Sequence, residues 1–362
     1  MKEMTVKNVG IWALLAFSTC FSFTAVGSDA DGPTARKIGY VLTSVTWAVF
    51  QTPDGKTECP EGFNEGPREQ FASLFPNLGT VADTQLEREG TARYPQDKSD
   101  NFPYRRAEGR LSYGLNLDGK VDTNDFTSPD GEAGIDNELF RAIGCTRLFR
   151  GPDGTFVHFT NLWLREMNFN RVLVELTDVD SLENDDAVNV TIYRGKDRLM
   201  TDATGAKILP GGSIRVDERF GKKFIHHQKG RIVNGVLSTE PSDVTWPWGV
   251  FLQRPGSYFI HGLRFQMKLG VEEAEGLVAG YADVESWYQQ LVRSWSTHHS
   301  SYGGLSQPSL YHQLSQLADG YPSKEGQNTA ISSAMNVTFT KVFIEHTNKK
   351  ITKLPHGRVL GE

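Results

Sequence analysis

The segment RVLVELTDVDSLENDDAVNVTIYR, residues 171–194, contains two runs of β-branched and aliphatic residues separated by a polar stretch. The first run covers residues 172–177 and the second covers residues 187–193. Runs of this length and composition predict β-strands, and the Asn-Asp-Asp in the connection is typical of a turn. The segment therefore predicts two consecutive strands joined by a short loop.

The same pattern continues towards the C-terminus. Further β-rich runs are separated by Asp-Ala-Thr-Gly, Leu-Pro-Gly-Gly and Arg-Pro-Gly, which are turn sequences. No helical pattern lies between these runs, and strands at such spacing favour an antiparallel sandwich over a parallel α/β sheet. We therefore expect a mainly β protein with an antiparallel β-sandwich core and a few short helices. The further strands of this core are expected at residues 213–217, 232–237, 257–269 and 276–281.

Helices and strands are also expected outside this run of strands. Two helices are predicted near the C-terminus, where Asp283 can cap the first and Pro308 fits the first turn of the second. Residues 77–110 show little periodicity and predict a long loop region. The expected elements are strands at 40–50 and 337–344 and helices at 67–75, 283–295 and 307–318.

The N-terminus has the pattern of a cleavable secretory signal peptide. Lys2 and Lys7 precede an apolar run at residues 9–23, and the small residues of Ala25-Val26-Gly27 suit cleavage. The apolar run is shorter than the ~20 residues that a membrane-spanning helix needs. We therefore expect a protein that is exported to the periplasm or the extracellular space and keeps no stable membrane span. The expected organisation is a signal peptide at 1–27, a flexible leader at 28–37, a loop-rich region at 38–165, the β-sandwich domain at 166–346 and a basic tail at 347–362.

Cysteine usage agrees with export. Cys20 lies in the predicted signal peptide, so Cys59 and Cys145 are the pair left in the mature chain. Thiols oxidise in extracytoplasmic compartments, which favours a disulfide between the two. Two buried free thiols are the alternative interpretation. The formal net charge of −6 argues against nucleic acid and anionic membranes as partners, because both select basic patches.

The densest cluster of charge is acidic and follows the predicted loop region. Residues 114–126 read GLNLDGKVDTNDF, with oxygen-bearing side chains at alternate positions around Gly119. This segment resembles the calcium loop of dockerin modules and EF-hands, in which ligands alternate and glycine occupies position six. In that register Gly114 holds position one, where the family has Asp, and Asp125 holds position twelve. No family is recognised for the whole chain.

The resemblance implies a set of calcium ligands, and the acidic stretch that follows can complete it. A hard cation such as Ca²⁺ prefers six to eight oxygen ligands. The loop itself offers Asn116, Asp118, the carbonyl of Lys120, Asp122 and Asp125, and the next stretch offers Asp130, Glu132, Asp136 and Glu138. Carboxylates packed together repel one another unless water or a cation separates them. The sequence therefore predicts calcium as a cofactor, with a solvated acidic surface loop as the alternative.

Signals for catalysis are weaker. The acids Asp283 and Glu285 lie beside aromatic residues, and His298 with His299 could act as bases. The simpler reading of Asp283 is a helix cap. Trp246 and Trp248 lie between predicted strands, where exposed tryptophans could stack against sugars.

Two functions are consistent with these features. The first is an exported, calcium-stabilised β-rich protein that binds or supports a glycan or another component of the cell envelope. The alternative is a secreted, calcium-dependent hydrolase that acts on glycans. Whether the protein is an enzyme stays open at this point.

Overall fold

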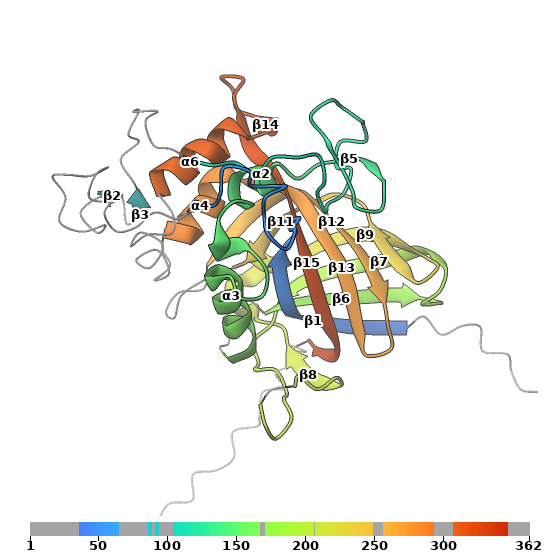
Figure 1. Ribbon diagram of the computed structural model, residues 1–362. Coiled ribbons are helices and arrows are strands. Elements are labelled where there is room, and N and C mark those ends of the chain that lie inside the picture. The colour runs from blue at the N-terminus through green and yellow to red at the C-terminus, as the bar shows by residue number, and fades with distance from the viewer. Residues whose placement is uncertain are drawn as a thin grey trace, which may run out of the picture. The chain divides into compact units, whose positions relative to one another are not determined.

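Antiparallel strands close into an eight-strand barrel in the computed structural model (Figure 1). Each strand pairs with the next along the path, and the last strand pairs back to the first. The strands of the closed path are, in order, β1 (Arg36–Trp47), β6 (Val172–Val179), β7 (Asp185–Arg194), β9 (His226–Val233), β10 (Val236–Thr239), β12 (Ser257–Leu269), β13 (Glu273–Asp283) and β15 (Asn328–Glu345).

The structure describes residues 36–64, 86–88, 91–93, 104–166, 171–205, 207–248, 256–292 and 307–346. Strands account for 45% of the described residues, so the prediction of a mainly β protein is confirmed. Within the described ranges, no helix is long and apolar enough to cross a membrane.

The predicted β-sandwich is wrong. Gly39 of β1 lies opposite Glu175 of β6 and also opposite Val342 of β15, so β1 closes the sheet on itself. The two backbones approach closely here, because a Cβ atom on Gly39 would lie 2.6 Å from the carbonyl oxygen of Val342. Sandwiches and barrels share the same alternation of buried and exposed residues. Closure depends instead on pairings between the two ends of the chain.

Shorter strands extend the barrel at its margins. β11 (Ser242–Pro247) pairs with β12, and β14 (Gly320–Pro322) pairs with β15. β8 (Gly212–Arg215) pairs in parallel with the end of β15. Two small hairpins lie outside the barrel sheet, formed by β2 (Leu86–Arg88) with β3 (Thr91–Arg93) and by β4 (Phe126–Thr127) with β5 (Ala133–Ile135).

The helices lie outside the barrel wall. α2, α4 and α6 contact one another or the strands β12, β13 and β15, and Figure 1 shows them grouped near β14. α3 packs against β1, where the Asn161 side chain accepts from the amide of Val45 and donates to its carbonyl, both at 2.8 Å. The helices are α2 (Glu138–Ile143), α3 (Thr155–Glu166), α4 (Val284–Val292) and α6 (Gln307–Gln316), with 3₁₀ turns η2 (Arg147–Phe149) and η3 (Glu218–Phe224).

Several elements differ from the sequence-based expectation. The strand expected at 232–237 is two strands, because Asn234 and Gly235 adopt positive φ angles of 50° and 78° and form a tight turn between β9 and β10. An Asn-Gly pair is the usual sequence of such a hairpin turn. α3 lies within the predicted loop-rich region. The helix expected at 67–75 lies outside the described residues.

The barrel is filled by apolar side chains from alternate positions of its strands. Tyr40, Phe265 and Phe339 are all less than 2% exposed and belong to one large cluster. On the outer wall, a second cluster joins Leu117 of residues 114–126, which we call the acidic segment, to Ala279 of β13 and Ala334 of β15. The small alanine side chains leave room for this loop to lie against the barrel. The acidic segment is thus fixed to the outside of β13 and β15.

Candidate functional site

A cavity of about 680 Å³ lies where the acidic segment, α2, β13 and the region before β14 meet. We call it the acidic cavity, because six carboxylates and a single arginine line it. Its acids are Asp118, Asp122, Asp125, Asp136, Glu138 and Asp319, and its other polar lining residues include Asn124, Arg141, Tyr281, Gln316 and Asn328.

Hydrogen bonds to the barrel and to Asp136 hold the acidic segment in place. Arg264 of β12 donates to the carbonyl oxygens of Asn116 and Leu117 at 2.9 and 2.6 Å. Asp136 accepts from the amides of Leu117 and Asp118 at 2.6 and 3.3 Å. One carboxylate therefore shapes the loop and lines the cavity at the same time.

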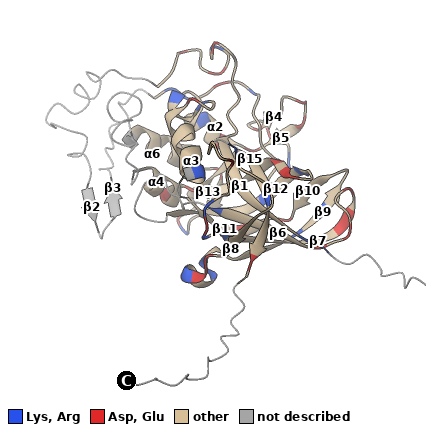
Figure 2. Cartoon of the chain, turned by 90° about the horizontal axis from the view of Figure 1, so that it is seen from below, with Lys and Arg blue, Asp and Glu red and all other residues tan. Residues whose placement is uncertain are grey.

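Positive charge in the cavity is already paired. Arg141 contacts Glu138 at 3.0 Å and donates to the carbonyl oxygen of Asn124 at 3.1 Å. Lys120 reaches Asp118 at 3.2 Å from outside, with its side chain 68% exposed. The other acids of the cavity have no basic residue among the described lining residues. Figure 2 shows that basic and acidic residues are both spread over the described elements.

Burial, with a smaller contribution from neighbouring carboxylates, raises the pKa values of three acids in the cavity. Desolvation raises the pKa of Asp136 to about 6, and the negative charges of Asp118 and Asp125 add to the effect. Desolvation, with a smaller contribution from Glu138, raises the pKa of Asp319 to about 6 as well. Burial also raises the pKa of Glu138. These three acids are harder to ionise than free carboxyls, so the cavity favours a proton or a cation.

The raised pKa values predict how stability depends on pH in the absence of divalent cations. Between about pH 4 and pH 6, the folded protein binds more protons at Asp136 and Asp319 than the unfolded chain does. Stability from these groups is therefore present at low pH and is lost as the pH rises through about 6. With chelator present, raising the pH from 5 to 7 should lower the melting temperature of the native protein. The same change of pH should have a smaller effect on an Asp136→Asn, Asp319→Asn variant, which lacks both groups. Equal pH dependence in both proteins would contradict the assignment.

The loop itself does not adopt the geometry of an EF-hand. Gly114, at the first ligand position, is buried, and a Cβ atom there would lie 2.8 Å from the Ile135 side chain. Asn116 accepts from the amide of Gly119 at 2.7 Å and donates to the carbonyl oxygen of Lys120 at 2.6 Å. The Lys120 carbonyl, a predicted ligand, is therefore occupied by an amide group. Among the described residues, no group of three or more acidic, histidine or cysteine side chains is close enough to hold a metal ion as the side chains stand.

Only part of the predicted set of calcium ligands lines the acidic cavity. Asp118, Asp122, Asp125 and Asp136 line the acidic cavity together with Glu138. Asn116 and Lys120 do not line it, because their polar groups bond within the loop or point outward. Asp130 and Glu132 are exposed at the turn between β4 and β5.

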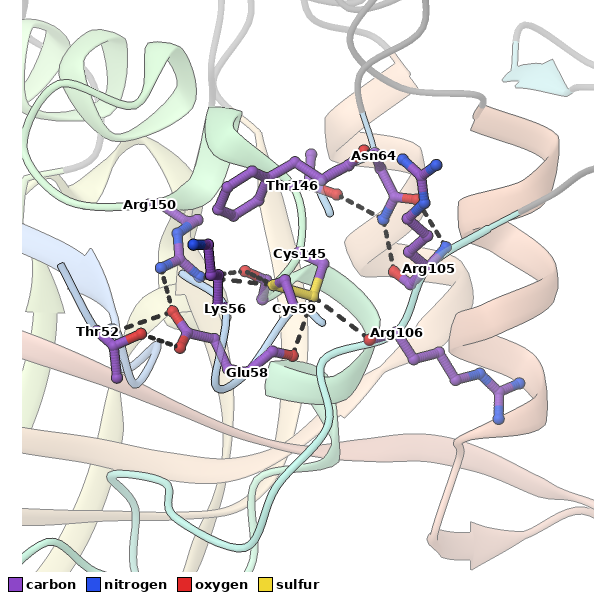
Figure 3. Close-up of a disulfide and its surroundings, with 12 residues drawn as sticks. Thr52, Lys56, Glu58, Cys59, Asn64, Arg105, Arg106, Cys145, Thr146 and Arg150 are labelled. Carbon is purple, nitrogen blue, oxygen red and sulfur yellow. Dashed lines mark hydrogen bonds and ion pairs between the residues drawn. A yellow bond between two sulfur atoms is a disulfide. The ribbon is translucent and has the colours of Figure 1, made fainter. Parts of the chain in front are cut away.

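The predicted disulfide is confirmed (Figure 3). Cys59 and Cys145 are joined with their Cα atoms 5.6 Å apart, and both residues are buried. Beside the bond, the buried carboxylate of Glu58 pairs with Arg150 and accepts from the Thr52 amide at 3.1 Å. Because Cys145 follows α2 by two residues, the crosslink ties the helix that carries Glu138 and Arg141 to the segment after β1.

Of the weaker catalytic candidates, the two acids do not line the acidic cavity. Asp283 accepts from the amide of Ser286 at 2.7 Å and so caps α4, as its position in the sequence indicates. Glu285 accepts from Gln289 at 3.0 Å and from the Tyr311 hydroxyl at 3.1 Å. Neither acid lines the cavity. His298 and His299 lie outside the described residues.

The two tryptophans proposed for stacking are buried, so that expectation is wrong. Trp246 is 0% exposed and Trp248 is 6% exposed, and both belong to the main core cluster. Trp248 packs edge-on against Tyr258 and Trp47, with ring centroids 5.9 and 5.6 Å away. The position between predicted strands was misleading, because β11 continues the wall of the barrel and directs Trp246 inwards.

Sequence reasoning missed Asp319 and Tyr281. They come from segments about 200 and 160 residues after the acidic loop, and only the pairing of β13 and β14 with β15 brings them to it. No motif around either residue indicated a site. Comparison with known proteins finds no matching family model, no similar curated protein and no similar solved structure.

Proposed function

We propose that the protein is an exported, calcium-stabilised binding protein of the cell envelope and that the acidic cavity is its site. The observation that carries the proposal is the set of six carboxylates around one cavity whose arginine is already paired. The signal-peptide pattern and the disulfide support an extracytoplasmic location. A glycan or another envelope component is the proposed partner.

Calcium suits the chemistry of this cavity. Ca²⁺ takes six to eight oxygen ligands at 2.3–2.6 Å and tolerates irregular geometry, which a smaller cation such as Mg²⁺ does not. Bound Ca²⁺ would stabilise the ionised forms of Asp136 and Asp319, whose pKa values are raised mainly by burial and further by neighbouring carboxylates. The cavity is wide, so the acids of the loop must move inward to meet the ion. Asp118 and Asp122 are exposed and can make that movement.

Thermal unfolding with calcium and with chelator tests the proposal. A ligand that binds only the folded state stabilises it, by about 2.7 kcal/mol at a hundred times the dissociation constant. We expect calcium to raise the melting temperature at pH 7, and to raise it less at pH 5, where Asp136 and Asp319 are protonated.

Two variants distinguish an effect of the cavity carboxylates on calcium binding from an effect of surface charge in general. Asp118→Asn keeps the hydrogen-bond acceptor for the Lys120 amide, at 2.8 Å in the native protein, and removes one cavity charge. Asp130→Asn removes an exposed charge outside the cavity. The calcium effect should shrink in the first variant and persist in the second. An equal melting temperature with calcium and with chelator in the native protein would overturn the proposal.

A further inference from the structure

An aromatic cluster lies directly beside the acidic cavity. Tyr281 lines the cavity, and the ring of Tyr321 lies edge-on to it with centroids 5.5 Å apart. Tyr321 also stacks on His261, with centroids 4.0 Å apart and planes 18° from parallel. We call these three residues the aromatic platform. It borders the cavity on the side formed by Asp319 and Asn328, which flank β14.

The backbone is adapted to hold Tyr321 at the surface. Its φ angle is 55°, in the left-handed region that costs energy for a residue with a side chain. The hairpin of β14 and β15 fixes this conformation, and Thr329 donates to the Tyr321 carbonyl at 2.7 Å. Tyr321 remains 41% exposed. A large aromatic residue is thus held in a costly conformation without being buried, which is common at binding sites.

Glycines on both sides make room for the rings. A Cβ atom on Gly320 would lie 2.6 Å from the Tyr281 ring, and one on Gly262 would lie 3.1 Å from the Tyr321 hydroxyl. Asp243 then fixes the edge of the platform. Its carboxylate accepts from the Gly262 amide at 3.0 Å and lies 3.6 Å from Nδ1 of His261.

We propose that the aromatic platform binds the apolar face of a neutral pyranose ring, with the rest of an oligosaccharide reaching into the acidic cavity. The inference rests on the proposed function, because it names the ligand of the same site. An exposed aromatic ring offers a flat apolar surface to the C–H face of a sugar. The carboxylates of Asp243 and Asp319 accept hydrogen bonds from hydroxyl groups. The surplus of carboxylates disfavours uronic, sialylated and phosphorylated sugars, which would bring further negative charge.

Calorimetric titration with neutral pentasaccharides tests this inference. The probes are cello-, xylo-, malto- and N-acetylchitopentaose, each with calcium and with chelator. We expect at least one to bind, and Tyr321→Gly to bind it about tenfold more weakly through loss of the ring. Glycine adopts a positive φ freely, so this variant keeps the backbone and separates loss of the ring from loss of structure.

Two further variants complete the design. Tyr321→Phe keeps the ring and should keep most of the affinity. Phe343→Ala removes an exposed aromatic of β15, 67% exposed and not in the platform, and should leave affinity unchanged. The inference is overturned if no probe binds, or if Tyr321→Gly binds as the native protein does.

The titrations with calcium and with chelator distinguish a failure of this inference from a failure of the proposed function. Sugar binding that depends on Tyr321 but is equal with calcium and chelator, in a protein that calcium does not stabilise, supports the platform and contradicts the calcium site. Stabilisation by calcium without sugar binding contradicts the platform alone.

Discussion

Removing the disulfide with a Cys59→Ala, Cys145→Ala variant is expected to lower the free energy of unfolding by roughly 2–5 kcal/mol. The bond joins residues 86 positions apart, so its loss frees a long loop in the unfolded chain. Alanine is the suitable replacement, because both positions are buried and a serine hydroxyl there would add a buried polar group. Chemical denaturation of the oxidised native protein and of the variant measures the difference.

Reduction of the native protein provides the control for this prediction. Reductant should move the native unfolding midpoint towards that of the variant and leave the variant unchanged. The two substitutions leave both members of the Glu58–Arg150 ion pair unchanged, so the comparison addresses the crosslink. A variant as stable as the oxidised native protein would show that the bond adds nothing to the fold.

Trp246→Ala is expected to cost about 3–5 kcal/mol of stability, because it empties the space of a large core side chain. Trp246 is 0% exposed and packs near Phe265, with ring centroids 6.4 Å apart. Equilibrium unfolding measures the loss. If Trp246 were instead a surface platform for sugars, its removal would change stability by no more than about 0.5 kcal/mol.

Trp246→Phe is the matched control. It keeps an aromatic ring in the core and removes the indole N–H, which is buried without a hydrogen-bond partner among the described residues. Loss of an unsatisfied polar group offsets part of the lost packing. We therefore expect Trp246→Phe to be clearly more stable than Trp246→Ala, and equal losses in the two variants would contradict this account of the core.

The strands could be predicted from local sequence, whereas the closure of the sheet could not. Residues 172–177, 187–193 and 257–269 are strands as their composition and flanking turns indicated. The barrel requires β1 to pair with β15 almost 300 residues away, and composition carries no information about which distant strands meet. The dipeptide Asn234-Gly235 is itself a turn sequence, and it divides the single strand expected at 232–237 into two.

The candidate site, too, could be predicted from local sequence only in part. The acidic stretch between residues 116 and 138 was visible because its carboxylates are close in sequence, and five of them do line one cavity. The loop resemblance misplaced Asn116 and Lys120, since the side-chain amide of Asn116 bonds the Lys120 carbonyl. Asp319, Tyr281 and Tyr321 reach the site only through strand pairing with β15. These residues belong to the site because of the tertiary structure, so the sequence around each of them does not indicate a site.

Equilibrium dialysis against calcium at pH 7 tests the central claim most directly, because it measures the ion on the protein rather than an effect on stability. The account predicts stoichiometric calcium on the native protein. It also predicts loss of that calcium in an Asp118→Asn, Asp136→Asn variant and retention in an Asp130→Asn, Glu132→Gln variant, whose acids lie outside the cavity. A native protein that retains no calcium, or a cavity variant that retains as much as the native protein, would contradict it.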